Sequence, residues 1–255
     1  MKYAVIGGTG IYDLLESSKK KTINTKYGEV ELDIVQIKDL EVAFLARHGK
    51  EHSTPPHKIN YRANMQALAD LGIKYVFATA AVGSCSKKFA PGDIVVIDDF
   101  IDFTKFREQT FYDGENKDVM HFEMDDPYCQ NLRKKFYNKA NAKSLAIKGS
   151  GVYLCTEGPR FETAAEIKMF KKLGGEVIGM TGVPEVVLAK ELHMCYASIG
   201  IVTNWATGFG ASVNIHQIKK SLNENKEKIT EIFIEVFRDS PDQNNCNCKD
   251  AGIRV

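Results

Sequence analysis

A strand-length apolar run, Cys195 to Val202, ends abruptly in the polar pair Thr203 and Asn204. The only tryptophan of the chain, Trp205, and a glycine-containing turn follow directly. Ligands of open α/β proteins bind at the carboxyl ends of strands, so this Thr-Asn pair is a candidate recognition site. A turn-forming asparagine that only ends the strand is the competing interpretation.

Similar small polar clusters occur at the ends of other expected strands. They are Gly8-Thr9, Arg47-His48, Thr79-Ala80-Ala81 and Met180-Thr181. A guanidinium fork, threonine hydroxyls and strand-end backbone amides together suit a phosphate-like anion. Each cluster alone has an ordinary explanation, but their repeated position at strand ends predicts one shared anion site.

Other chemistries fit the sequence less well. The spacing of His48, His52 and His57 matches no zinc motif, and the basic residues beside them would repel a cation. We therefore expect no metal. Ser84 follows a glycine but lacks the closing glycine of a nucleophile elbow, which argues against serine hydrolysis.

A glycine-rich turn follows the first expected strand and leaves a second class of function open. Gly8 and Gly10 resemble the start of a dinucleotide fingerprint, but Asp13 occupies the place of its third glycine. An NAD-binding oxidoreductase is therefore the alternative from another class. The hydroxyl of Thr9 in this turn suits a single phosphate better.

Strand-like and helix-like segments alternate along the chain without internal repeats. This alternation predicts a single-domain, three-layer α/β/α sandwich with a mostly parallel or mixed central sheet. A capping box of Thr163 and Glu166 predicts a helix start. The segment from Phe100 to Asp126 has no clear period and is expected to be a long functional or subunit-contacting loop. Pro184 is expected at the first position of a helix.

The composition is that of an ordinary globular protein. The chain has 255 residues, 44% of them hydrophobic, and a formal net charge of +1. This charge gives no general reason to expect nucleic acid or an acidic membrane as the partner. No segment is long enough and apolar enough to span a bilayer, so a cytoplasmic location is expected. We divide the chain into a domain at 1–239 and a polar C-terminal tail at 240–255.

Six cysteines occur in two different settings. Those in apolar surroundings read as small buried hydrophobes: Cys85, Cys129, Cys155 and Cys195. Cys246 and Cys248 lie in a polar tail that offers no further metal ligands. A disulfide between them is one hypothesis, and a disordered tail with two exposed thiols is the other.

Five motifs taken together are similar to the methylthioadenosine phosphorylase branch of the trimeric purine nucleoside phosphorylases. They are GGTGIYD at 7–13, ARHG at 46–49, PGD at 91–93, TEGPRF at 156–161 and MTGVPEVVLAKE at 180–191. The similarity extends from Met1 to about Asp239. It implies a phosphorylase-like fold and the phosphate-dependent cleavage of purine nucleosides to free base and ribose 1-phosphate in purine salvage. Inorganic phosphate would be a co-substrate, with no metal or organic cofactor.

The resemblance also implies roles for individual residues. Phosphate would be held by Thr9, Arg47, His48, Ala80, Ala81 and Thr181. Met180 would lie against the ribose, Phe161 would flank the base, and Thr203, Asn204 and Ala206 would face its edge, with Asn204 and His48 as catalytic groups. His121 would reach the 5′ pocket of a neighbouring subunit, which implies a homo-oligomer, a trimer or a dimer of trimers. Ile215 and His216 would form walls of the 5′ pocket.

The sequence departs from the adenine-using members at the position where those resemble Thr-Asp-x-Asp. Asn204 and Ala206 replace both carboxylates. An asparagine amide can donate to a 6-oxo group and accept from N7–H, whereas a carboxylate only accepts. This favours 6-oxopurine nucleosides such as inosine, guanosine or methylthioinosine. Glu162 could accept from N1–H, although an exposed carboxylate at a helix start is the simpler interpretation. An adenine-accepting S-methyl-5′-thioadenosine phosphorylase remains the alternative.

Overall fold

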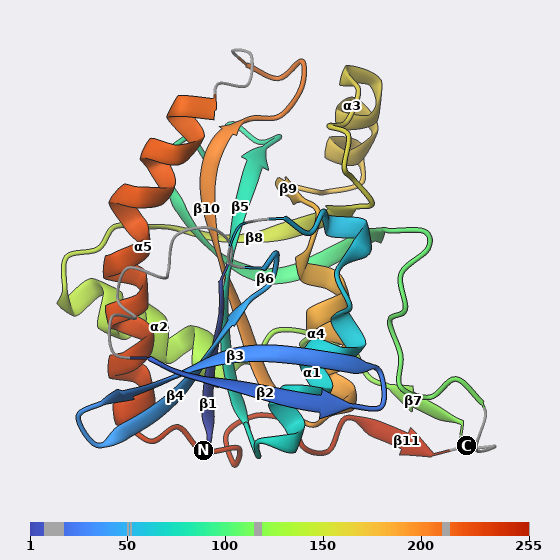
Figure 1. Ribbon diagram of the computed structural model, residues 1–255. Coiled ribbons are helices and arrows are strands. Elements are labelled where there is room, and N and C mark those ends of the chain that lie inside the picture. The colour runs from blue at the N-terminus through green and yellow to red at the C-terminus, as the bar shows by residue number, and fades with distance from the viewer. Residues whose placement is uncertain (8–17, 50, 52, 115–118, 211–214, 255) are drawn as a thin grey trace.

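A large mixed β-sheet forms the centre of the molecule (Figure 1). The computed structural model describes residues 1–7, 18–49, 51, 53–114, 119–210 and 215–254, with only the helical backbone for 215–224. Within these residues, nine strands follow the order β10-β6-β8-β9-β5-β1-β4-β3-β2. Their bounds are β1 Tyr3–Gly7, β2 Lys19–Thr25, β3 Gly28–Ile37, β4 Leu40–Ala46, β5 Tyr75–Ser84, β6 Ile94–Phe103, β8 Ile147–Thr156, β9 Val177–Gly179 and β10 Cys195–Trp205.

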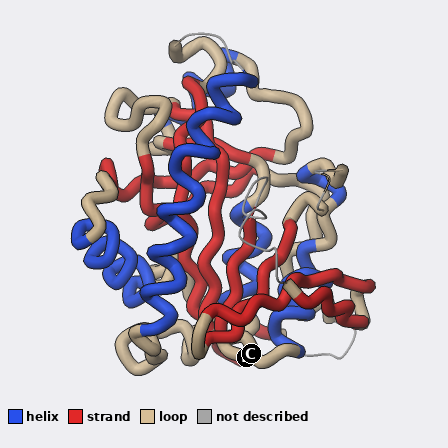
Figure 2. Tube along the Cα trace, turned by 60° about the vertical axis from the view of Figure 1, so that its left-hand side comes forward, coloured by secondary structure: helices blue, strands red, loops and turns tan. Residues whose placement is uncertain are grey.

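Helices cover both faces of this sheet. They are α1 Tyr61–Asp70, α2 Gln130–Ala142, α3 Ala164–Lys172, α4 Gly182–Glu191 and α5 Ile215–Arg238, with a 3₁₀ turn at Pro56–Lys58. In strand β1, Ala4 and Ile6 point into the core beneath α1 and α4, while Tyr3 and Val5 point into the core beneath α2 and α5. The longest helix, α5, runs along the strands (Figures 1 and 2). The expected three-layer arrangement with a mixed sheet is therefore confirmed.

The sheet also closes on itself, which the sequence pattern did not predict. Strand β5 pairs with β1 and β10 in parallel and with β9 in antiparallel, while β10 continues through β6 and β8 back to β9. Strands β1, β4, β5 and β10 are parallel, so their carboxyl ends share one edge. Arg47-His48 and Met180-Thr181 directly follow β4 and β9, as predicted. The expected strand ends at Ala81 and Val202 are wrong, because β5 continues to Ser84 and β10 to Trp205, so Thr79-Ala80-Ala81 and Thr203-Asn204 lie inside these paired strands. Gly8-Thr9 lies outside the described residues.

Several segments differ from the sequence-based expectations. Strand β2 was not predicted because its lysine-rich residues are mostly exposed and carry little hydrophobic signal. The expected loop from Phe100 begins inside β6 and later contains strand β7 (Met120–Phe122). Helix α4 begins two residues before Pro184, at Gly182. The capping box of Thr163 and Glu166 is present as predicted.

The C-terminal tail packs against the rest of the chain. Strand β11 (Gly252–Arg254) pairs with β7 in a two-stranded sheet. All six cysteines have free thiols, so the first of the two hypotheses, a Cys246–Cys248 disulfide, is not met in this structure. The alternative of two exposed thiols is also wrong, because Cys248 is only 4% exposed. None of the described helices is long and apolar enough to span a membrane.

Candidate active site

A buried ion pair between Arg47 and Glu185 lies at the centre of the predicted anion site. The Glu185 carboxylate accepts hydrogen bonds from Nε and Nη2 of Arg47, the latter at 2.8 Å. Its Oε2 also accepts from the Tyr196 hydroxyl at 2.7 Å. Both members of the pair are nearly fully buried. A bidentate carboxylate fixes the plane of the guanidinium, so Arg47 is held in one orientation.

The backbone places Arg47 at the shared edge of the sheet. Arg47 follows β4 directly, and its N–H donates to the carbonyl of Gly7 at the end of β1 (3.1 Å). Its Nη1 donates to the carbonyl of Thr79 in β5 (2.9 Å). Together with the two bonds to Glu185, this bond to Thr79 uses three of the five N–H donors of the guanidinium. Among the described residues, the other two donors have no partner and can bind an anion.

The protonation of Arg47 is secured by its partner. Burial acts to lower the pKa of Arg47, but the charge and hydrogen bonds of Glu185 outweigh burial and raise it. Burial and the neighbouring Glu185 carboxylate likewise hold the pKa of Tyr196 well above its ordinary value. Arg47 therefore remains cationic, and Tyr196 remains a neutral donor, at any pH at which the protein works.

Strand β5 opens to the surface beside Arg47. Ala81 is exposed, whereas the other nine residues of this central strand are buried. The roles expected for Ala80 and Ala81 depend on their backbone amides being accessible to a ligand. At this exposed position a ligand can reach the backbone without displacing a side chain. His48 lies next along the chain from Arg47, is mostly buried, and donates from Nδ1 to the Thr54 carbonyl at 2.8 Å. This bond orients the imidazole ring.

The start of α4 supplies the second wall. Thr181 is the N-cap of this helix and is buried. The hydroxyl oxygen of Tyr153 accepts from the backbone N–H groups of Thr181 and Gly182 at 3.1 and 3.3 Å. Met180 packs against Gly158, where a Cβ would come within 2.7 Å of its sulfur. Glycine is required at 158 because of this approach and its positive φ of 64°.

The end of β10 lies beside the outer half of β5. The Asn204 amide accepts from the Thr203 hydroxyl (2.8 Å) and donates to the Trp205 carbonyl (2.8 Å), which leaves it one further donor and one further acceptor. Asn204 is paired with Gly83, where a Cβ would lie 3.3 Å from its Nδ2. Ala206 is buried next to the same glycine.

Phe161 and Glu162 precede α3 and have opposite environments. Phe161 is 56% exposed. Glu162 is buried, and its Oε1 accepts from the Thr156 hydroxyl at 2.6 Å. The interpretation of Glu162 as an exposed carboxylate at a helix start is therefore wrong. The same Thr156 hydroxyl lies 3.5 Å from the carbonyl of Gly179, at the end of β9, so Glu162 faces the strand that joins β8 to β5.

Not all predicted residues join this site. Thr9 and the glycine turn around it lie outside the described residues, as do the side chains of Ile215 and His216 at the start of α5. His121 is exposed on β7, where it pairs with Ile253. Figure 1 places β7 near the C-terminus, at the opposite end of the molecule from the carboxyl end of β5.

Sequence reasoning missed the residues that orient the site. Glu185 was part of a quoted motif but was given no role. Its signal is a carboxylate between Val183 and Val186 in a helix that is buried almost throughout, because a charge in such a place needs a partner. Tyr153 gave no comparable signal, since a tyrosine inside an apolar strand is ordinary.

Comparisons with known proteins agree with this architecture. The sequence profile of the phosphorylase superfamily matches residues 2–238. A 6-oxopurine nucleoside phosphorylase of Pyrococcus furiosus is 46% identical over 98% of this chain and 97% of the relative. An S-methyl-5′-thioadenosine phosphorylase of Pyrococcus abyssi is 44% identical over 98% and 97%.

Solved structures extend the likeness to three dimensions. The methylthioadenosine phosphorylase from an antarctic soil metagenomic library superposes with a TM-score of 0.89 at 30% identity, over 98% of this chain and 90% of that chain. An adenosine/methylthioadenosine phosphorylase double mutant from Schistosoma mansoni, in complex with adenine, gives 0.87 at 33% identity, over 95% and 93%. Family profile, relatives and fold agree, and the chain belongs to the phosphorylase superfamily.

Proposed function

We propose that this protein is a 6-oxopurine nucleoside phosphorylase that cleaves nucleosides such as inosine and guanosine with inorganic phosphate. The observation that supports this base preference is the position of two polar groups. The buried carboxylate of Glu162 and the amide of Asn204 lie on either side of the paired strands β9 and β5, where they can contact a purine. Membership in the superfamily also removes the reason for the dinucleotide-binding alternative, which rested on Gly8 and Gly10 alone.

Phosphate is bound by the groups around Arg47. The two remaining donors of the guanidinium, the His48 imidazole, the Thr181 hydroxyl and the backbone amides of Ala80 and Ala81 hold the dianion, with Thr9 as a further ligand. C1′ of the ribose becomes oxocarbenium-like as the bond to the base breaks. A phosphate fixed on one face of the ring stabilises this positive charge and is already placed for attack. Catalysis then rests on positioning, with inorganic phosphate as co-substrate and no organic cofactor.

The purine is selected by the polarity of its edge. A 6-oxopurine carries a proton on N1, to which the free oxygen of Glu162 is an acceptor. Adenine presents a lone pair at N1, which the carboxylate would repel. Asn204 donates to O6 and accepts from N7–H, so it also stabilises the departing base. Phe161 flanks the ring, Met180 lies against the ribose, and Ala206 leaves room where a carboxylate would favour an amino group.

The active enzyme is a homo-oligomer, a trimer or a dimer of trimers, in this proposal. His121 lies on an exposed strand far from the site of its own chain, a position that suits a contribution to the 5′ pocket of a neighbour. Ile215 and His216 form further walls of that pocket. An adenine-accepting S-methyl-5′-thioadenosine phosphorylase is the second candidate, because relatives of nearly equal identity carry that name.

Initial rates with inosine, guanosine, adenosine and methylthioadenosine, each with and without phosphate, test the proposal. Faster phosphate-dependent release of hypoxanthine and guanine is expected, with ribose 1-phosphate as co-product. Free ribose would indicate hydrolysis instead. Faster cleavage of the adenine nucleosides would leave the phosphorylase but reject the proposed base preference. Glu162→Gln should lower the inosine rate selectively, whereas Glu176→Gln should not, because the Glu176 carboxylate contacts the Val152 N–H and Lys88 and has no proposed role at the base.

A further inference from the structure

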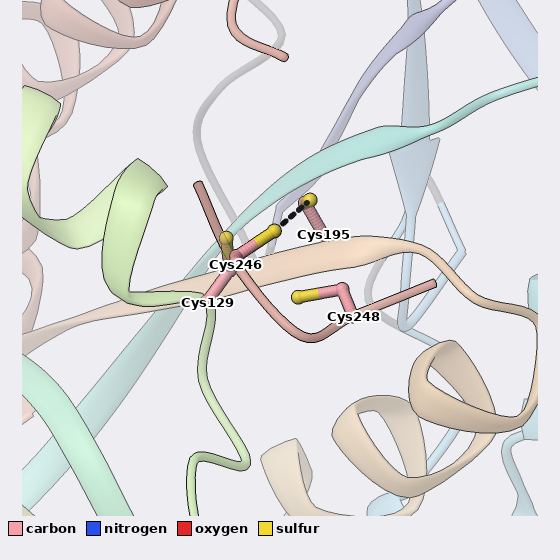
Figure 3. A group of neighbouring side chains, drawn as sticks. All are labelled: Cys129, Cys195, Cys246 and Cys248. Carbon is pink, nitrogen blue, oxygen red and sulfur yellow. Dashed lines mark hydrogen bonds between the residues drawn. The ribbon is translucent and has the colours of Figure 1, made fainter. Parts of the chain in front are cut away.

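Four cysteine side chains from three separate parts of the chain meet at one point (Figure 3). Cys129 is the N-cap of α2, Cys195 begins β10, and Cys246 and Cys248 lie in the C-terminal tail. The four sulfurs lie within 4.8 Å of one another, and those of Cys195 and Cys246 are 3.5 Å apart. Three of the four residues are buried and Cys246 is partly exposed.

The backbone around the cluster holds it together. The N–H of Cys129 donates to the carbonyl of Tyr196 at 2.8 Å, which fixes Cys129 beside Cys195. The tail is anchored just before its two cysteines, because Gln243 Nε2 donates to the His193 carbonyl at 2.8 Å. Upstream of that contact, Asn131 Nδ2 donates to the Asp242 carbonyl, also at 2.8 Å. Two thiols thus stand on rigid elements, and the tail brings two more to them.

The spacing of the sulfurs fits tetrahedral coordination. Zinc–thiolate bonds of about 2.3 Å place the sulfurs of a tetrahedral Cys₄ site roughly 3.8 Å apart. The sulfurs of Cys195 and Cys246 are 3.5 Å apart, slightly below this distance, and no pair of the four sulfurs is more than 4.8 Å apart. Four convergent thiols select a soft, tetrahedral cation.

The charges around the cluster complement a bound metal thiolate. Lys190 is 4% exposed and lines the same pocket of about 180 Å³ as Cys129, Cys246 and Cys248. Its ammonium donates to the Asp126 carbonyl (2.8 Å), and among the described residues no carboxylate lies within ion-pair distance of it. A divalent cation with four thiolates carries two negative charges, which would offset this buried ammonium.

Two further groups adjoin the cluster. The Asp126 carboxylate also lines the pocket, but it accepts from Gln130 Nε2 at 2.6 Å and lies 4.0 Å from Arg133 Nη2. Cys129 stands at the positive end of the α2 dipole, where a thiolate is favoured. The electrostatic surroundings therefore suit an anionic metal–thiolate centre.

We propose that Cys129, Cys195, Cys246 and Cys248 bind one Zn²⁺ ion in a structural Cys₄ site remote from the reaction. Sequence spacing does not predict this site, because the C-x-C pair of the tail lacks further ligands nearby and the other two cysteines are far away along the chain. Each thiol loses its proton on binding, and no electron transfer is involved. The metal ties the tail to α2 and β10.

The test is the metal content of the full-length protein purified anaerobically with a non-chelating reductant and supplied with Zn²⁺. About one zinc per chain is expected, with cobalt substitution giving the thiolate-to-cobalt charge-transfer and d–d bands of a tetrahedral sulfur site. Cys246→Ser and Cys248→Ser should lose the metal, whereas Cys85→Ser, at a buried thiol elsewhere, should keep it. Lys190→Met should weaken zinc binding about 10- to 100-fold.

Two results would overturn the proposal. An intact mass lower by about 2 Da for each bond formed, without metal, would show disulfides in place of a metal site. Six titratable thiols after denaturation of a metal-free protein that does not bind added Zn²⁺ or Co²⁺ would show an empty cluster. The wild-type cobalt spectrum decides between these outcomes even if the serine variants fail to fold.

Discussion

Arg47 needs its partner for geometry more than for stability. Burying an arginine and a glutamate costs both their hydration, and the attraction between them roughly repays this cost. The pair holds the guanidinium in one orientation, because Glu185 accepts hydrogen bonds from two of its nitrogens and the Thr79 carbonyl accepts one from the third. The guanidinium that we propose as a phosphate-binding group is thus held in its binding orientation before phosphate arrives.

Glu185→Gln tests this positioning role. Loss of the carboxylate leaves a buried, unpaired guanidinium, so we expect unfolding in urea to show a loss of about 3 kcal/mol. Misplacement of the remaining donors should lower kcat/KM for phosphate roughly 100-fold. Glu191→Gln is the matched control, since Glu191 is buried on the same helix but accepts from Phe111. Equal phosphate kinetics in the two variants would contradict the assignment.

Asn204 is the residue at which base preference should change. In Asn204→Asp the side chain can no longer donate to O6 but can accept from a 6-amino group. We expect the ratio of kcat/KM for inosine to that for adenosine to fall roughly 100-fold. Asn225→Asp, on helix α5, should leave the ratio unchanged. An unaltered ratio in Asn204→Asp would mean that this amide does not read the purine edge.

At the scale of elements, the start of α3 determines where the proposed base-contacting residues Phe161 and Glu162 lie. Thr163 Oγ1 accepts from the Glu166 N–H, and Glu166 Oε2 accepts from the Thr163 N–H at 2.7 Å. Glu166 also forms a bidentate contact with Arg160. These bonds bracket Phe161 and Glu162 on both sides. An exposed aromatic and a buried carboxylate are therefore positioned by a helix cap that was visible in the sequence.

The pH dependence of this cap follows from Glu166. Its hydrogen bonds with Arg160 and Thr163 lower its pKa from 4.5 to about 2. A depressed pKa contributes stability that is complete above pH 4.5 and is lost as the pH falls towards 2. The difference in urea midpoint between the wild type and Glu166→Gln should therefore be constant from pH 7 to 5 and shrink below 4.5. A difference that stays the same down to pH 3 would contradict this account.

At the scale of the whole molecule, sequence patterns predicted the features that depend on residues close together in the chain. Apolar runs and the capping box gave the layers, and polar residues at strand ends gave Arg47, Thr181 and Asn204. The rest depends on contacts between distant segments. The closed sheet needs β5 to pair with β10 and β9 at once, and the cysteine cluster needs the tail to reach α2. The burial of Glu162 was not predicted, because it depends on a contact with Thr156 at the end of β8.

The C-terminal tail connects the cysteine cluster with the strand that carries His121. Strand β7 carries His121 and pairs with β11 of the tail, which follows the four-cysteine cluster directly. Deleting residues 249–255 removes β11 and keeps all four cysteines, so metal content should not change. Without its partner strand, a three-residue strand is not stable, and His121 should lose its fixed position. We expect KM for the nucleoside to rise several-fold, about as in His121→Ala, while KM for phosphate stays constant. An unchanged KM for the nucleoside in both variants would mean that His121 plays no part in a neighbour's pocket.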